Sequence, residues 1–261
     1  LGDLDSAEFT RLMSAITEWV APEQGCSYCH ADGEELSADT LYTKVVARRM
    51  LQMTRDLNDQ WGAHVAPAGV TCYTCHRGQP VPAARWFTDP GPRTAGGMSG
   101  YKNGQNMPAA TVGHASLPFD PFSPFLLGDQ NIRVVSTTAL PEGNETAIMQ
   151  TEKTYGLMTH ISEALGVNCT FCHNTRSFFA WDQSGEPRTK AWYGIRMVRH
   201  VNNDYIGPLA SVFPPHRLGP LGDAPKANCA TCHRGAAKPL LGAAMLKDYS
   251  GLGSASAPVT Q

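Results

Sequence analysis

The chain has 261 residues, of which 42% are hydrophobic and 17% are charged, and its formal net charge is −2 at pH 7. This composition is typical of a globular protein and excludes intrinsic disorder. No apolar run approaches the roughly 18 to 20 residues of a membrane-spanning helix. The charge gives no basic field that would hold a nucleic acid backbone.

Two helices are predicted in the first third of the chain. Apolar residues recur at helical spacing over residues 6–20, and Asp5 or Ser6 is the candidate N-cap. A second helix, with Thr40 as its candidate cap, places Val46, Met50, Met53 and Leu57 on one face.

Two further helices are predicted in the second half. One ends at Gly166, and the other covers about 189–204. Strands are scarce, and the best candidate is the short run Ile132–Ser136. The pattern therefore favours a mainly α protein with much irregular structure.

All eight cysteines belong to four copies of one pattern, Cys-x-x-Cys-His, and each predicted helix precedes one copy. The copies comprise Cys26, Cys29 and His30; Cys72, Cys75 and His76; Cys169, Cys172 and His173; and Cys229, Cys232 and His233. C-x-x-C-H is the attachment signature of c-type haem, because two thiols form thioethers to the vinyl groups while the histidine binds the iron. The sequence therefore predicts four covalently bound haems with these histidines as proximal ligands.

Two other uses of paired cysteines fit the pattern less well. Cysteines with only two residues between them form strained, redox-active disulfides rather than long-range crosslinks. Zinc ribbons also use C-x-x-C pairs, but they give no reason for a histidine after every pair. Covalent haem attachment takes place outside the bacterial cytoplasm, so we expect an exported protein whose signal segment is not part of this sequence.

The motifs come in two pairs, and the second motif of each pair continues identically, as Arg77-Gly78 and Arg234-Gly235. This repetition indicates two pseudo-symmetric dihaem halves in which a helix, a turn and a C-x-x-C-H unit pack each haem. Four haems would form much of the core among few side chains. The predicted segments are a first half at 1–78, a Pro/Gly-rich connection at 79–145, a second half at 146–240, and a C-terminal tail at 241–261. We expect this tail to be extended or mobile.

A haem that only passes electrons needs a protein ligand at its second axial position. Met13, Met50 and Met158 lie on the apolar faces of the helices before the first three motifs, and Met53 rivals Met50. A methionine on an apolar stripe is usually a core residue. Here the helix, turn and motif recur and each iron needs a ligand, which favours ligation.

The sequence leaves the ligand of the fourth haem open. Met197 occupies the position that matches Met50 when the halves are superposed, and His64 stands in a loop before the second motif. His216 follows two prolines and is not in a helical pattern. We expect His114 and His160 to be plain surface histidines. His200 is the remaining histidine outside the four motifs.

These residues resemble the tetrahaem cytochrome subunit of purple-bacterial photosynthetic reaction centres. The resemblance covers about residues 6–240 and rests on the four motifs, on the helix methionines before the first three, and on ARRMLQMTRDLN, GVTCYTCHRG and WYGIRMVRHVN. In that family the first three haems take a methionine from the preceding helix, and the fourth takes a histidine just upstream of the second motif. The resemblance therefore implies Met13, Met50, Met158 and His64 as distal ligands.

The resemblance also implies a function. The haems would form a row on the periplasmic side of the photosynthetic membrane, bound to the reaction-centre membrane subunits, with the third-motif haem nearest the bacteriochlorophyll special pair. A soluble cytochrome c or high-potential iron–sulfur protein would donate electrons near the first-motif haem. The subunit would re-reduce the photo-oxidised pair and would not be an enzyme.

Other expectations follow from the residues. Arg77 and Arg234 are candidates to neutralise haem propionates. A free periplasmic multihaem cytochrome, with histidine at every sixth position, fits the methionines less well. A multihaem reductase would need one iron left open for substrate, whereas a ligand can be nominated for every haem.

Overall fold

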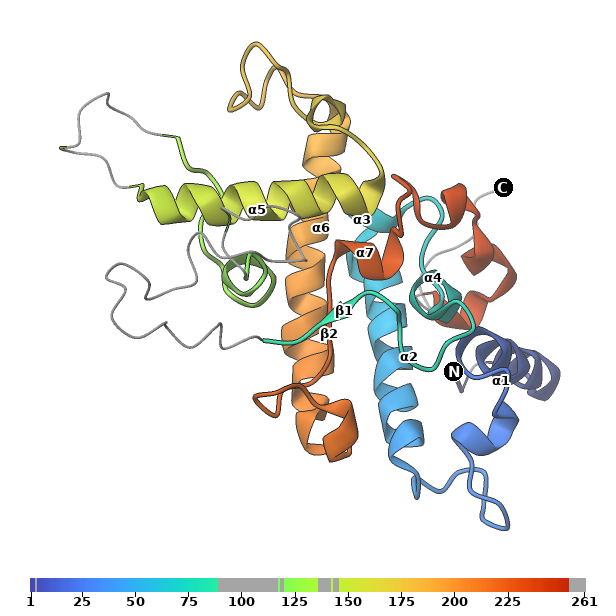
Figure 1. Cartoon of the computed structure of the whole chain (residues 1–261). Coiled ribbons are helices and arrows are strands. Elements are labelled where there is room, and N and C mark those ends of the chain that lie inside the picture. Colours follow the sequence, from blue (N-terminus) through green and yellow to red (C-terminus); the bar gives the residue numbers. More distant parts are fainter. Residues whose placement is uncertain (3, 89–116, 118–119, 136–141, 143–145, 254–261) are drawn as a thin grey trace.

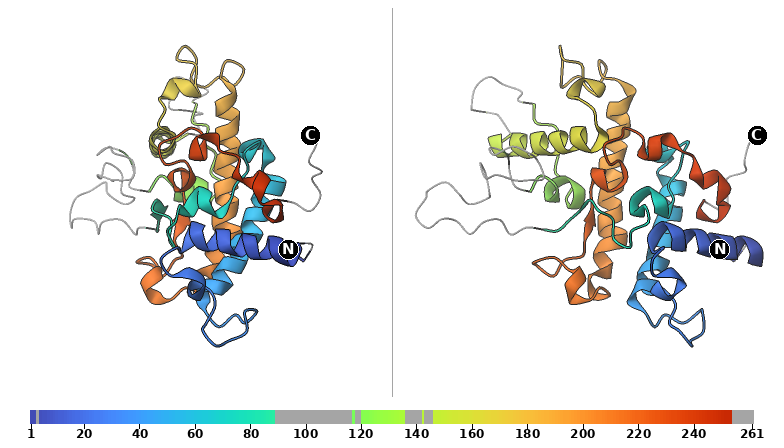
Figure 2. Two further views of the ribbon diagram at one scale, coloured as in Figure 1. Left: turned by 90° about the vertical axis from the view of Figure 1, so that its right-hand side faces the viewer. Right: turned by 45° about the vertical axis from the view of Figure 1, so that its right-hand side comes forward.

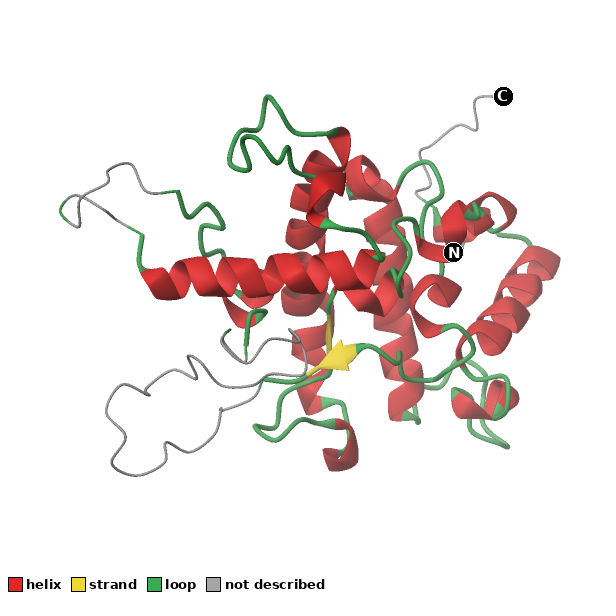
Figure 3. Cartoon of the chain, turned by 45° about the horizontal axis from the view of Figure 1, so that its top comes forward, coloured by secondary structure: helices red, strands yellow, loops and turns green. Residues whose placement is uncertain are grey.

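The computed structural model describes residues 1–253 except residue 3 and the segments 89–116, 118–119, 136–141 and 143–145. Within these residues, helices joined by long irregular connections make up most of the molecule, as predicted (Figure 3). None of the helices in the described ranges is long and apolar enough to cross a membrane.

The first helix, α1 (Ser6–Val20), has the predicted bounds. The carboxylate of Asp5, the predicted cap, accepts a 2.8 Å hydrogen bond from the Glu8 amide, which satisfies one of the free N–H groups of the first turn. Leu12 and Trp19 are buried on the inner face. After a turn, η1 (Gly25–Tyr28) carries the first thiol of the first motif.

The second helix, α2 (Tyr42–Gln60), starts one residue later than a cap at Thr40 would place it. Leu41 occupies the N-cap position, and the Thr40 hydroxyl bonds Glu34 instead, so the Thr40 prediction was wrong. The loop that was expected around His64 is a short helix, α3 (Gly62–Val65). The second motif forms α4 (Cys72–His76), with a capping box between Thr71 and Thr74.

In the second half, α5 (Ile148–Leu165) ends at Gly166 as predicted, because this glycine adopts the left-handed conformation with φ 66°. The next turn, η3 (Cys169–Phe171), carries the third motif. Helix α6 (Glu186–His200) starts before the predicted residue 189, because Pro187 fits the first helical turn. It continues as a π-helix, η4 (Val201–Ile206).

Short turns complete the fold. They are η2 (Ser123–Leu127), η5 (Gly207–Ser211), η6 (Pro215–Arg217), α7 (Cys229–Cys232), which carries the fourth motif, η7 (Pro239–Gly242), η8 (Met245–Asp248) and η9 (Ser250–Leu252). The described part of the predicted tail, residues 241–253, forms short helical turns instead of the expected extended chain, and Leu252 is fully buried in a cluster with Leu12 and Trp19. Apolar side chains in this segment account for the difference.

The predicted strand at Ile132–Ser136 was wrong, because its described residues, 132–135, are irregular. The Thr154 hydroxyl of α5 donates to the Ile132 carbonyl at 3.2 Å, so a helix side chain bonds this segment. The two described strands are β1 (Arg85–Trp86) and β2 (Lys226–Ala227), which pair antiparallel with Arg85 opposite Ala227. This pairing joins the chain after the second motif to the chain before the fourth.

Helices α2 and α6–η4 lie side by side, and α5 crosses α6 (Figures 1 and 2). The helices that precede or carry the motifs also form a series of contacts, in which α1 packs on α4, α4 on α7, and α7 on α5. His160, expected on the surface, is 7% exposed and meets the edge of the Phe122 ring. This contact with Phe122, the residue before η2, was not indicated by the sequence pattern.

Candidate haem-binding site

A cavity of about 1560 Å³ lies between the two halves of the chain. Its lining includes the cysteine pairs and the histidines of the first, second and fourth motifs. Ligand pockets usually measure about 300–1,000 Å³, so this cavity has room for more than one large cofactor. The cysteines and the histidine of the third motif, all of which the structure describes, lie outside it, beside α5 and the start of α6.

Backbone carbonyls orient the histidines of the second, third and fourth motifs, whereas Nδ1 of His30 is buried without a hydrogen-bond partner among the described residues. The Nδ1 atom of His76 bonds the Gln79 carbonyl at 2.9 Å, and Nδ1 of His233 bonds the Ala236 carbonyl at 3.0 Å. His173 makes the equivalent 2.9 Å bond to Phe178. Such a bond fixes the tautomer with the proton on Nδ1 and leaves the Nε2 lone pair for a metal.

Burial supports the same protonation state. It lowers the pKa of His76 and of His233, although the backbone carbonyls partly oppose this effect. Burial likewise lowers the pKa of His64. Since neutral imidazole is the form that binds a metal, these three side chains are suited to bind iron.

His64 faces the proximal histidine of the fourth motif. The ring centroids of His64 and His233 are 6.0 Å apart, with ring planes at 66°. Two metal–imidazole bonds of about 2 Å on opposite sides of one ion place the two rings about 6 Å apart. The Nδ1 atom of His64 bonds the Lys190 carbonyl of α6 at 2.8 Å, so its Nε2 is left available. The pair therefore fits the two axial positions of one haem.

Gly194 of α6 makes room for this arrangement. A Cβ atom on Gly194 would lie 2.6 Å from Cε1 of His64, closer than atoms approach without a shift. Sequence reasoning did not select this residue. The signal was a glycine inside a helix, which costs about 1 kcal/mol relative to alanine and usually has a packing or functional reason.

The rival ligand Met197 is also close. It is 7% exposed, lines the cavity and packs with Leu57 and Val201. This apolar cluster gives Met197 a packing role that is independent of any metal.

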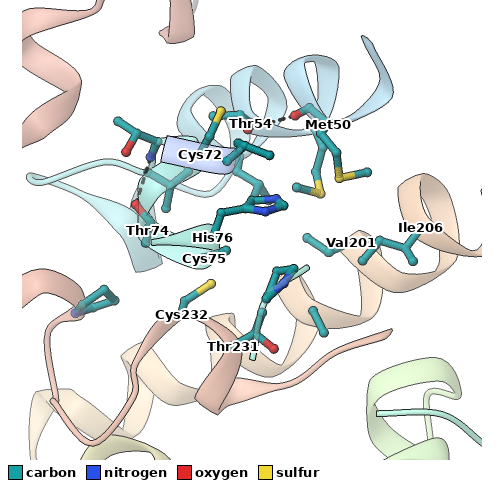
Figure 4. Close-up of a pocket in the computed structure, with 18 of the residues that line it drawn as sticks. Met50, Thr54, Cys72, Thr74, Cys75, His76, Val201, Ile206, Thr231 and Cys232 are labelled. Atoms are coloured by element: carbon teal, nitrogen blue, oxygen red, sulfur yellow. Dashed lines mark hydrogen bonds between the residues drawn. The ribbon is translucent and has the colours of Figure 1, made fainter. Parts of the chain in front are cut away.

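Of the candidate methionine ligands, those of α1 and α2 lie on this cavity, whereas that of α5 does not. Met13 of α1, and both Met50 and Met53 of α2, line the cavity. Figure 4 shows the side chains of Met50 and His76 directed into the same pocket. Met158 of α5 packs against the core cluster around Leu157 and Ile161 and does not line this cavity.

The remaining histidines have other surroundings. His216 lies in η6 and lines the cavity. Both ring nitrogens of His200 bond carboxylates, Nε2 to Asp56 at 2.6 Å and Nδ1 to Asp204. His114 lies outside the described residues.

Comparison with known proteins identifies the family. A family model described as "Photosynthetic reaction centre cytochrome C subunit" matches residues 1–253. The chain belongs to this family. It is therefore an electron-transfer component rather than an enzyme, and c-type haem is its cofactor.

Individual relatives carry the same name or that of another cytochrome. The photosynthetic reaction center cytochrome c subunit of Rubrivivax gelatinosus is 58% identical over 258 residues, which cover 98% of this chain and 70% of the relative. That of Thermochromatium tepidum is 54% identical over 97% of this chain and 62% of the relative. Cytochrome c-554 of Chloroflexus aurantiacus is 28% identical over 65% of this chain and 48% of the relative. The two subunits are thus longer than the chain.

Proposed function

We propose that the protein re-reduces the photo-oxidised bacteriochlorophyll special pair of a reaction centre through four covalently bound haems. The observation that carries this proposal is one apolar cavity on which three C-x-x-C-H motifs meet candidate distal ligands. The haem supplies one-electron chemistry, and the protein holds each group, excludes water and sets its potential. The family membership of the chain and the names of its relatives support the same role.

The distal ligands of this proposal are Met13, Met50, Met158 and His64. The spacing of the His64 and His233 rings favours His64 over Met197 for the fourth haem. The position of Met50 and Met13 on the cavity supports their assignment. Met158 is assigned from the resemblance and from its place on the helix before the third motif.

The order of the haems follows from the contacts of their helices. Because α1 packs on α4, α4 on α7 and α7 on α5, the haem sites follow one another as first, second, fourth and third. The two dihaem halves then meet in the middle of the row, between α4 and α7. This order places the first-motif and third-motif haems at opposite ends, one for the electron donor and one for the special pair.

The partners follow from this role. The subunit associates with the reaction-centre membrane subunits at the periplasmic side of the photosynthetic membrane. Its donor is a soluble cytochrome c or a high-potential iron–sulfur protein. Eight ionised propionates would add about −8 to the formal charge of −2, so exposed haem edges would attract a cationic carrier.

A flash experiment tests the proposal. Gently solubilised native membranes are washed free of soluble carriers, and the haem α-band is recorded after a single flash. Oxidation of the haem faster than any diffusional encounter is the expected result. A haem that stays reduced while the bacteriochlorophyll remains bleached would assign the protein to another respiratory or periplasmic pathway.

A further inference from the structure

The second and fourth motifs share a turn that the haem ligands do not explain. Each motif is followed by an Arg-Gly pair in the left-handed conformation, with φ 51° and 80° at Arg77-Gly78 and φ 50° and 81° at Arg234-Gly235. For glycine this conformation costs little, but an arginine adopts it only where its surroundings hold it there. Two arginines held in the same strained conformation call for a specific contact.

That contact is reciprocal. Arg77 Nη2 donates to the Cys232 carbonyl at 3.1 Å, and Arg234 Nη2 donates to the Cys75 carbonyl at 2.8 Å. Each arginine thus bonds the last cysteine of the other motif. Both bonds span the junction of α4 with α7.

The glycines of the same turns bond the helix of their own half. The Gly78 amide donates to the Trp19 carbonyl of α1 at 2.8 Å, and the Gly235 amide donates to the Ala164 carbonyl of α5 at 2.7 Å. Each Arg-Gly turn therefore joins its own motif, the first helix of its half and the motif of the opposite half. The arginines do not line the cavity, which places them behind the haem-binding surface.

The two attachment sites are in direct contact at this junction. The bond from Arg234 to the Cys75 carbonyl holds its charge one residue from His76, the proximal histidine of the opposite half. The bond from Arg77 to the Cys232 carbonyl does the same beside His233. Each positive charge therefore lies close to the haem site of the opposite half.

We infer that Arg77 and Arg234 form a reciprocal clasp that fixes the second-motif and fourth-motif haem sites against each other and raises the midpoint potential of both. This inference rests on the proposed assignment of four haems. A fixed positive charge favours the form with the extra electron, so it raises the midpoint potential of a haem close to it. In this role the arginines are positioning residues, and their pairing with haem propionates stays a prediction from the sequence.

The fourth haem allows a selective test, because two histidines would distinguish its near-infrared and magnetic spectra from those of haems with a methionine ligand. The variant is Arg77→Gln, which removes a charge from the second motif. The expected result is a midpoint of the fourth haem that falls by ~59 mV, a tenfold drop in its reduced-to-oxidised ratio at fixed potential. Arg133→Gln, which removes an exposed arginine, is the matched control and should leave that midpoint unchanged.

Two further variants separate charge from folding. Arg77→Lys keeps the charge, so the midpoint potential of the fourth haem should stay close to that of the unaltered protein. If the Lys and Gln variants lower this midpoint equally, the electrostatic part of the inference is overturned. Arg234→Gln should lower the midpoint potential of the second-motif haem. This variant replaces Arg77→Gln as the test if Arg77→Gln binds haem poorly. A fourth haem with the same midpoint in Arg77→Gln and Arg133→Gln would refute the clasp. These titrations need no light, so a failed flash experiment would reject the proposed function without deciding this test.

Discussion

His64 and His233 face each other across 6.0 Å, although one precedes the second motif and the other belongs to the fourth. Both rings are oriented by backbone carbonyls through Nδ1, His64 by Lys190 at 2.8 Å and His233 by Ala236 at 3.0 Å. In the proposed assignment, the fourth haem site is therefore built from both halves of the chain. The internal repeat of the sequence would instead have predicted two ligands from the second half, His233 and Met197.

The first prediction concerns the chemistry of this site. In His64→Met, thioether sulfur replaces imidazole, and the midpoint of the fourth haem should rise by on the order of 0.1 V. Potentiometric titration of the haem α-band measures the change. Met197→Leu is the matched control, because it removes the rival sulfur from the same cavity. A shift in Met197→Leu with none in His64→Met would make Met197 the ligand.

The second prediction concerns the space that His64 needs. Gly194→Ala places a methyl group 2.6 Å from Cε1 of the His64 ring, so the ring must leave its present position opposite His233. The fraction of fourth haem with two histidine ligands, measured by low-temperature electron paramagnetic resonance, should fall. Gly62→Ala is the control, since a Cβ atom there meets nothing within 4 Å. Equal spectra for the two variants would contradict the steric argument.

The third prediction separates two methionines of α2. Met50→Leu should open the sixth position of the second-motif haem, so the reduced protein should bind carbon monoxide at that iron. Met53→Leu should leave the position closed, because Met53 contributes packing beside Leu57. Difference spectra with and without carbon monoxide measure this. The reverse pattern would assign the ligand to Met53.

The fourth prediction tests the proposed third-motif haem site, whose cysteines and histidine lie outside the large cavity. Met158→His exchanges thioether for imidazole on α5, and the midpoint of the haem at Cys169 and Cys172 should fall. Redox titration of the α-band measures this midpoint. If it stays at the value of the unaltered protein, Met158 is a core residue and another side chain ligates that iron.

The fifth prediction concerns stability at the junction of η2, β2 and η4. Asn202 is 1% exposed; its amide donates to the carbonyls of Leu126 at 3.1 Å and Ala227 at 3.0 Å, and its oxygen accepts from the Ala227 amide at 2.8 Å. Asn202→Ala leaves buried backbone groups without partners and should cost about 2–4 kcal/mol of unfolding free energy.

Urea unfolding followed by circular dichroism measures this loss, with Asn203→Ala as the control. Asn203 is exposed and donates one bond, to the Leu127 carbonyl at 2.8 Å, so its loss should change the unfolding free energy by about 0.5 kcal/mol or less. Similar destabilisation in the two variants would show that burial of Asn202 contributes little.

The sequence by itself determined the chemistry and the local structure of this protein. Cys-x-x-Cys-His is a contiguous pattern, so four haem attachment sites and four proximal histidines can be predicted without a fold. Helix α1 and the end of α5 were also predictable, because Asp5 and Gly166 act on the backbone within one turn. Thr40 misled the prediction, since its hydroxyl bonds Glu34 rather than the first turn of α2.

Only the tertiary structure decided which distant residues meet. His64 faces His233, and Gly194 leaves it room, because α3 packs on α6; periodicity along the chain carries no information about that contact. The contact of the buried His160 with Phe122 is equally non-local. The physical reason is that a motif depends on bonds between neighbours in the chain, whereas a ligand opposite it depends on packing between segments that the sequence separates widely.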